Sequence, residues 1–95
     1  MNQNYGQLFK MLSDDTRLQI LRLLSQGHTC GCTLIERLSI TQPTLSYHLQ
    51  ELTNCGILTS YKEGVWKKHR INPDTIDELI SFLSSLKEQA KESHL

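Results

Sequence analysis

The feature that most constrains the fold is a pair of helical segments separated by only three residues. Apolar residues at helical spacing predict a short helix over Thr33–Leu38 and a longer one over Gln42–Asn54. In the connection between them, Thr41 is a good N-cap for the second helix. Pro43 falls in the first turn of that helix, where its missing N–H costs little. Two helices joined this tightly predict a helix-turn-helix.

Two further helices are expected before this pair. Leu8, Met11 and Leu12 have the spacing of a first amphipathic helix. Ser13 or Asp14 can cap a second helix, because both side chains accept hydrogen bonds from free N–H groups. The apolar positions of this second helix are Leu18, Ile20, Leu21, Leu23 and Leu24, and Gly27 follows as a stop.

A hairpin and a final helix are expected after the pair. Two extended runs, Ile57–Lys62 and Trp66–Ile71, flank a turn signal at Glu63–Gly64. Pro73 then opens a last helix, whose apolar stripe consists of Ile76, Leu79, Ile80, Leu83 and Leu86. This order predicts one mainly α domain over residues 1–95 with a β-hairpin wing, a winged helix-turn-helix.

Length and composition limit the class of protein. A lone domain of 95 residues is marginal, so pairing with a second copy is a plausible way to bury more apolar surface. No apolar run reaches the roughly 18 residues of a membrane span, and Met1–Gly6 lacks the apolar core of a signal peptide. We therefore expect a cytoplasmic protein that contacts no membrane. The chain has no glycine-rich phosphate loop and no nucleophile motif, so neither an enzyme nor an organic cofactor is expected.

The net charge of zero conceals a segregation of charge along the chain. Residues 58–71 carry a net charge of +3, and residues 72–95 carry a net charge of −3. The basic residues of the first segment are Lys62, Lys67, Lys68 and Arg70. A basic segment balanced by an acidic tail fits a protein that touches phosphates on one side only. A solvated hairpin followed by a solvated helix would show the same charges.

The outward face of the helix over Gln42–Asn54 has the composition of a base-reading surface. At about 100° per residue, Leu45, Leu49 and Leu52 cluster on one face of this helix. The remaining positions near its start hold short, uncharged side chains that form hydrogen bonds. Such side chains can pair with base edges in the major groove. The residues expected to read double-stranded DNA are Gln42, Thr44, Ser46 and Tyr47.

Three features beside that face have alternative interpretations. His48 borders the apolar face and is either a packed histidine bonded to a neighbour or a contact to the DNA backbone, with metal binding as a weaker alternative. Trp66 would either join the wing along the DNA or pack over the edge of the core, and packing is the favoured interpretation. The lysines of the hairpin would lie along the DNA backbone and add affinity that does not depend on base sequence. These lysines are Lys62, Lys67 and Lys68.

The cysteines argue for thiol or metal chemistry rather than for a disulfide scaffold. There are three of them, and only Gly31 separates Cys30 from Cys32. These two fall just before or within the first turn of a helix, where free N–H groups lower thiol pKa values. Thiolates are the ligands that soft ions prefer. Cys55, near the end of the following helix, is either a third ligand or a small structural residue.

Several of these segments resemble the ArsR/SmtB family of metalloregulatory repressors. Ser13–Leu21 resembles the second helix of the family, and Thr41–Leu49 resembles its recognition helix. Gly56–Leu58 and the basic hairpin after it resemble the family's wing, and the whole similarity extends from about residue 8 to residue 86. The resemblance implies a homodimeric transcriptional repressor that pairs through its first and last helices. It also implies that the dimer leaves its operator DNA when an inducer binds.

The same resemblance suggests the inducer. Cys30 and Cys32 are similar to the cysteine pair of the arsenic-responsive members, which bind trivalent arsenic or antimony there. Those members often have a further cysteine at the position of Ile35, so this site would be two-coordinate or would borrow a third ligand such as Cys55. A thiol redox switch, or a zinc or cadmium sensor that includes His28, remains an alternative on the same scaffold.

The spacing of the cysteine pair suggests how inducer binding is transmitted. On a regular helix, residues two apart point roughly 200° from each other. One ion could therefore hold the sulfurs of Cys30 and Cys32 only by distorting the start of the helix, which Gly31 makes easy. Because this helix should pack against the recognition helix, we expect the distortion to tilt the recognition helix away from its bases.

Overall fold

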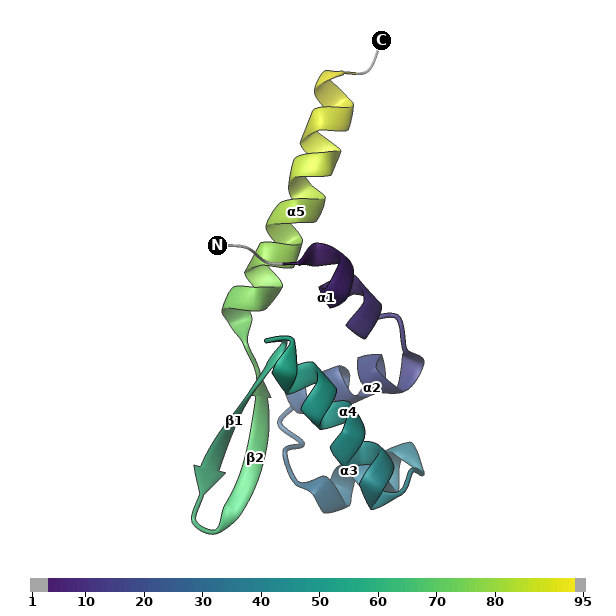
Figure 1. Ribbon diagram of the computed structural model, residues 1–95, viewed down its shortest axis with the longest axis vertical. Coiled ribbons are helices and arrows are strands. Elements are labelled where there is room, and N and C mark those ends of the chain that lie inside the picture. The colour runs from purple at the N-terminus through teal and green to yellow at the C-terminus, as the bar shows by residue number, and fades with distance from the viewer. Residues whose placement is uncertain (1–3, 94–95) are drawn as a thin grey trace.

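The structure follows the expected order of helices and strands. It is a computed structural model that describes residues 4–93. The elements are α1 (Tyr5–Met11), α2 (Asp15–Ser25), α3 (Gly31–Leu38), α4 (Gln42–Asn54), β1 (Leu58–Glu63), β2 (Trp66–Ile71) and α5 (Pro73–Glu92). In Figure 1, α1 to α4 gather together with the hairpin along one side, and α5 projects away from them. This is the predicted mainly α fold with a β-hairpin wing.

Polar caps determine where α2 and α4 begin. Asp14 is the N-cap of α2, because its carboxylate accepts a hydrogen bond from the backbone N–H of Arg17 at 3.0 Å. This bond is also the main reason that the pKa of Asp14 lies below its usual value. The Thr41 hydroxyl caps α4 by accepting from the backbone N–H of Thr44 at 3.3 Å. In both helices, a cap side chain therefore accepts a hydrogen bond from one of the backbone N–H groups that have no partner within the helix, as cap chemistry predicts.

Replacing Thr41 with alanine tests the cap on α4. The substitution removes the acceptor for the Thr44 N–H, so we expect the free energy of unfolding to fall by about 1 kcal/mol. Urea denaturation measures this difference. The matched control is T41S, which keeps the hydroxyl and should lose much less. If T41A were as stable as T41S, the hydroxyl would not be the cap.

The start of α3 differs from the prediction. The helix begins at Gly31 rather than at Thr33, and Cys30 is its N-cap, with an extended backbone at φ −79° and ψ 127°. The apolar pattern of this segment starts only at Leu34, so periodicity alone could not locate the first turn. At the other end, Ser39 adopts φ 55° and reverses the chain toward α4. Both cysteines of the pair therefore lie at the exposed N-terminus of a helix.

The hairpin closes as expected. β1 and β2 are antiparallel, with Leu58 opposite Ile71 at the base. Gly64 in the turn has φ 64°, a left-handed conformation that glycine adopts without strain. β2 has the predicted bounds, whereas β1 begins one residue after Ile57, which is fully buried in the core instead. The hairpin is thus anchored at its base and free at its tip.

One apolar core joins the helices to the base of the hairpin. Its members come from α1, α2, α3, α4 and the start of β1, and α5 contributes through its first two turns. The side chains that are less than 2% exposed are Leu8, Ile20, Leu34, Leu45, Leu52, Ile57 and Leu58. This core holds α4 between α3 and the hairpin, so it sets the position of the expected DNA-reading helix.

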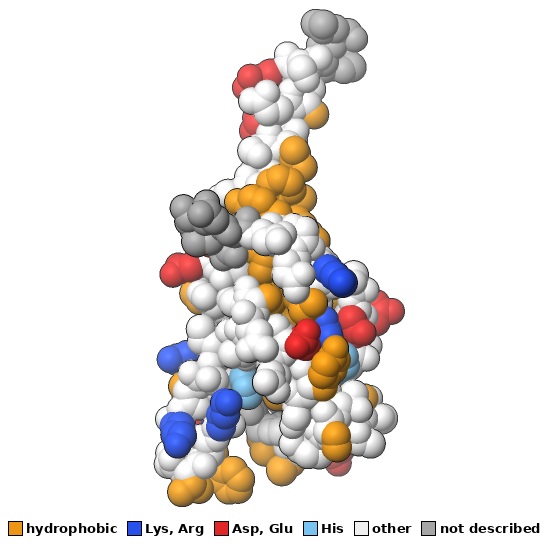
Figure 2. Space-filling model, in the orientation of Figure 1, with side chains coloured by type: hydrophobic (Ala, Val, Ile, Leu, Met, Phe, Trp, Pro, Cys, Tyr) orange, Lys and Arg blue, Asp and Glu red, His pale blue; other side chains and the backbone are white. Residues whose placement is uncertain are grey.

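Beyond its first turns, α5 presents an uncovered apolar stripe. Ile80, Leu83 and Leu86 are each more than 50% exposed, and Figure 2 shows apolar side chains along this helix where it leaves the body of the molecule. On α1, Tyr5 stacks against Phe82 of α5 with ring centroids 4.5 Å apart. The stripe therefore begins beside α1 and continues along the part of α5 that projects away from the other helices. In the described part of the chain, no helix combines the length and the hydropathy needed to cross a membrane.

Candidate nucleic-acid interface and thiol pair

The outward face near the start of α4 is exposed and uncharged. Tyr47 is 58% exposed, and Gln42, Thr44 and Ser46 are also exposed. The Gln42 amide donates to the Ser46 hydroxyl at 2.9 Å. The Thr41 hydroxyl donates to the Thr44 hydroxyl at 3.0 Å. These four residues of α4 therefore form an exposed, uncharged set of hydrogen-bonding side chains, which base edges could engage in place of water.

His48 does not belong to that exposed set. Its side chain is only 9% exposed, and its Nδ1 accepts a hydrogen bond from Nε of Arg17 at 3.0 Å. The structure therefore agrees with the interpretation of His48 as a packed histidine bonded to a neighbour, and a contact with DNA stays a prediction. Its burial follows from periodicity, because His48 lies three residues after Leu45 and four before Leu52, on the same buried side of the helix.

The three hairpin lysines differ in the charge they can offer to a phosphate. Lys68 forms an ion pair with Glu63, with Nζ 2.6 Å from Oε1. This contact raises the pKa of Lys68 and lowers the pKa of Glu63. Lys62 and Lys67 face each other across the hairpin, and neither has an ion-pair partner within residues 4–93. Lys62 and Lys67 thus present uncompensated charge, whereas the charge of Lys68 is already balanced.

Trp66 lies at the tip of the hairpin and does not cover the core. It is 69% exposed, and the adjacent Val65 is 89% exposed. Figure 2 shows apolar side chains at this end of the hairpin. The expected packing role of Trp66 is wrong because the strand register pairs this residue with Glu63, next to the turn and far from the buried base.

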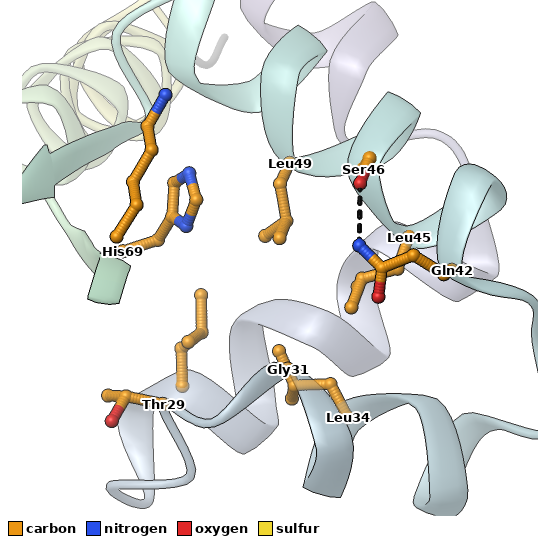
Figure 3. A pocket seen from close by; sticks show the side chains of 10 residues that line it. Thr29, Gly31, Leu34, Gln42, Leu45, Ser46, Leu49 and His69 are labelled. Atoms are coloured by element: carbon orange, nitrogen blue, oxygen red, sulfur yellow. Dashed lines mark hydrogen bonds between the residues drawn. The ribbon is translucent and has the colours of Figure 1, made fainter. Parts of the chain in front are cut away.

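A cavity connects the start of α3, the exposed face of α4 and the hairpin. Its volume is about 240 Å³, and Figure 3 shows side chains from all three segments around it. Its polar lining consists of Thr29, Gln42, Ser46, Lys67 and His69, and the backbone of Gly31 also lines it. The cavity is therefore lined together by Gln42 and Ser46, which are expected to read bases, by the unpaired wing lysine Lys67 and by Thr29 and Gly31, the neighbours of Cys30.

His69 and Thr29 are cavity residues that the sequence interpretation missed. Burial, followed by the nearby charge of Lys67, lowers the pKa of His69. Alternation along β2 could have identified His69, because Lys67, His69 and Ile71 share one face of the strand. No comparable pattern marks Thr29, which precedes α3 in an irregular segment.

Cys30 and Cys32 are exposed free thiols at the start of α3. The backbone N–H of Thr33, and after it the side chain of Cys32, lowers the pKa of Cys30. The Cys30 side chain and its charge raise the pKa of Cys32. The two side chains therefore interact, and each thiol shifts the pKa of the other. Cys30 is the thiol that ionises first and is the better initial nucleophile or ligand.

The geometry of the pair corrects one expectation about the helix. The opposed directions predicted for the two thiols assumed that both residues lie on a regular helix. Cys30 instead has the extended backbone of an N-cap, so its side chain can turn toward Cys32 without unwinding α3. The assumption that both sulfurs can meet only by distorting the helix is therefore wrong.

Cys55 and His28 do not join the thiol pair. Within residues 4–93, no three His, Cys, Asp or Glu side chains come together in a group that could hold a metal ion. The Cys55 thiol donates to the Leu52 carbonyl at 3.3 Å, at the end of α4. Within the described residues Cys55 and His28 are therefore not grouped with the thiol pair, and the third ligand and the mixed zinc site stay predictions.

Three comparisons with known proteins agree on a regulator. The sequence profile of bacterial regulatory proteins of the arsR family matches residues 14–60, which contain α2, α3 and α4. An uncharacterised HTH-type transcriptional regulator from Methanocaldococcus jannaschii is 41% identical over 82 residues, or 85% of this chain and 92% of that protein. An arsenical resistance operon repressor from Staphylococcus aureus is 39% identical over 77 residues, or 81% of this chain and 74% of that protein.

The fold is also that of a solved regulator. The homodimeric winged helix-turn-helix DNA-binding domain of a Mycobacterium bovis protein, determined by NMR, matches with a TM-score of 0.68 and 26% sequence identity. The match covers 96% of this chain and 84% of that one. The hairpin after α4 therefore corresponds to the wing of that domain, as the sequence predicted.

Proposed function

The chain belongs to the ArsR family of bacterial regulatory proteins, and from this premise we propose that it is a dimeric repressor released by a trivalent metalloid. The family makes it a transcriptional regulator rather than an enzyme. In the proposal, the dimer binds operator DNA in the cytoplasm and leaves it when trivalent arsenic or antimony binds Cys30 and Cys32. The observation that carries this proposal is the exposed thiol pair beside a cavity lined by Gln42, Ser46 and Lys67.

The arrangement of α4 and the hairpin suits double-stranded DNA. A recognition helix contacts base edges through its N-terminal residues, and in α4 this part carries Gln42, Thr44, Ser46 and Tyr47. Figure 1 shows that the start of α4 and the tip of the hairpin reach the same end of the molecule. With α4 in the major groove, Lys62 and Lys67 would therefore lie near the adjacent phosphates.

Two observations support a dimer. The stripe of Ile80, Leu83 and Leu86 on α5 has no cover in a single chain, and large apolar side chains rarely stay exposed in such a row. The similar domain from Mycobacterium bovis is a homodimer. Pairing through α1 and α5 would present two copies of α4 to successive major grooves, roughly 34–36 Å apart.

The cavity suggests how a bound metalloid would act on α4. When arsenite reacts with the pair, each sulfur replaces one hydroxide on arsenic, and the thiol proton leaves with that hydroxide as water. The product ties Cys30, before the helix, to Cys32 in its first turn. Gly31, between the two cysteines, lines the cavity opposite Gln42 and Ser46. It also lies close to α4, because a Cβ added to Gly31 would be 3.9 Å from the side chain of Leu45. A shift of this segment would therefore be transmitted directly to α4.

The test is a titration of the protein–DNA complex. A labelled duplex selected from a random library by the wild-type protein serves as the probe, and fluorescence anisotropy measures binding. Arsenite and antimonite should release the duplex at concentrations at which zinc and cadmium do not. Release by peroxide alone would favour a thiol redox switch, and release by zinc or cadmium alone would favour a metal sensor. Failure to select any duplex would contradict the repressor function itself.

Single alanine substitutions in the wing test the difference between the lysines. K67A should reduce the slope of log affinity against log salt by about 1, because an uncompensated charge leaves the phosphate interface. K68A should change the slope much less, because Glu63 already balances the charge of Lys68. Anisotropy titrations over a range of salt concentrations measure both slopes. Equal effects of the two substitutions would show that the ion pair opens when the wing meets DNA.

A further inference from the structure

Arg17 on α2 is a buried cation whose partners are unusual. Its side chain is only 8% exposed, yet no carboxylate lies within ion-pair distance of it among residues 4–93. Nε instead donates to Nδ1 of His48 at 3.0 Å, and Nη1 donates to the Met11 sulfur at 3.2 Å. Because burying a charge is costly unless it is well bonded, such an arrangement calls for a role that an apolar side chain could not fill.

The contacts of Arg17 link three helices. Met11 belongs to α1, Arg17 to α2 and His48 to α4. The guanidinium carbon also lies 5.7 Å from the ring centroid of Tyr47, within the range of a cation–π contact. One side chain therefore touches both the inward-facing His48 and the outward-facing Tyr47, which is an expected DNA contact.

The bond between Arg17 and His48 has a defined direction. Nε of Arg17 donates and Nδ1 of His48 accepts. A single directed bond therefore joins the imidazole on α4 to α2. Apolar contacts along α4 resist separation but are not directional, whereas a hydrogen bond weakens steeply when its geometry changes.

We propose that Arg17 and His48 are positioning residues for base reading. In this proposal, which rests on the proposed function of α4, the bond to Nδ1 fixes the rotation of α4 about its own axis. That rotation sets the direction of Tyr47 and of the other outward residues relative to the major groove. Because the same guanidinium contacts α1, the bond also ties the rotation of α4 to a helix of the expected dimer interface.

Two substitutions at one position separate this role from simple packing. In H48N, the side-chain oxygen can occupy the place of Nδ1 and accept from Arg17. In H48Q, the amide is one carbon further along and corresponds to Nε2 instead. Both replacements are neutral, polar and do not titrate near pH 7, so they differ mainly in where the acceptor lies. H48N should keep an affinity for the selected duplex close to that of wild type, and H48Q should lose about tenfold.

A second readout distinguishes positioning from loss of folded protein. Affinity for an unrelated duplex depends on phosphate contacts and not on the direction of α4 side chains. H48Q should therefore keep this non-specific affinity, and its ratio of specific to non-specific affinity should fall about tenfold. Thermal denaturation of both variants controls for stability. A merely structural defect would lower both affinities together.

The outcomes separate this proposal from the proposed function. If the wild type binds its selected duplex and H48N and H48Q bind it equally well, the positioning role is wrong and the repressor function stands. The same holds if each variant loses specific and non-specific affinity in parallel. If the wild type shows no preference for any duplex, both proposals are wrong.

Discussion

Replacement of both Leu83 and Leu86 by glutamate should make the protein monomeric and lower its affinity for a duplex with two half-sites by about 100-fold or more. Both side chains are more than 50% exposed in a single chain, so the charges should not disturb the fold of the monomer. At a dimer interface, however, each glutamate would have to be buried among apolar side chains without a partner, which is strongly unfavourable.

The loss of affinity follows from the linkage of two recognition helices. In a dimer, binding of one α4 holds the second copy near the adjacent half-site at a high effective concentration. A monomer loses this advantage and keeps only the affinity of one half-site. The double variant should therefore bind a duplex with one half-site about as well as a duplex with two, apart from the statistical advantage of having two equivalent half-sites to bind.

Light scattering after size exclusion measures the oligomeric state, and anisotropy measures binding to the two duplexes. The matched control carries glutamate at Ser81 and Ser85, which are exposed on the opposite side of α5. This control adds the same charge to the same helix and should remain a dimer. A dimeric protein with glutamate at positions 83 and 86 would show that the stripe on α5 is not the interface.

Replacement of Cys30 or Cys32 by serine should leave DNA binding intact but abolish release by arsenite. The two thiols are exposed and do not contribute to the core, so the fold and the face of α4 should persist. With one sulfur left, the metalloid loses the intramolecular second bond, and we expect release to need about 100-fold more arsenite or not to occur. Anisotropy of the preformed complex during an arsenite titration measures this shift.

The third cysteine provides the matched control for this experiment. Cys55 is bonded to the Leu52 carbonyl at the end of α4 and is not grouped with the pair. C55S should therefore respond to arsenite as the wild type does. If C30S and C32S were still released normally, the thiol pair would not be the inducer site. If C55S no longer released DNA in arsenite, Cys55 would also be a ligand, and its sulfur would have to reach the pair within the dimer.

Much of the fold could be predicted because it follows from local chemistry. The tight connection before Thr41, the proline in the first turn of α4 and the start of α5 at Pro73 all depend on residues within one turn of the element they begin. The bounds of β2 follow from its extended run and the turn at Gly64. Each of these features needs only the backbone preferences of neighbouring residues.

The candidate site was predicted in composition but not in all of its contacts. The exposed, uncharged side chains at the start of α4 and the thiol pair were identified because each group lies within one short segment. The assignment of Lys68 as a phosphate contact did not foresee its ion pair with Glu63. Trp66 was expected to pack, and the strand register carries it to the exposed tip instead. Both differences arise from pairing across the hairpin, which the order of residues does not specify by itself.

The tightly connected helices α3 and α4 show where local rules end. Helical period and cap chemistry act over a few residues, so the order of residues predicts that α3 and α4 exist, where α4 begins and which of its faces is apolar. The hydrogen bond between Arg17 and His48 could not be predicted in this way, and neither could the cavity that Gly31, Gln42 and Lys67 line together. Those contacts depend on how the helices and the hairpin are rotated against one another, and this rotation is set by the packing of the whole core.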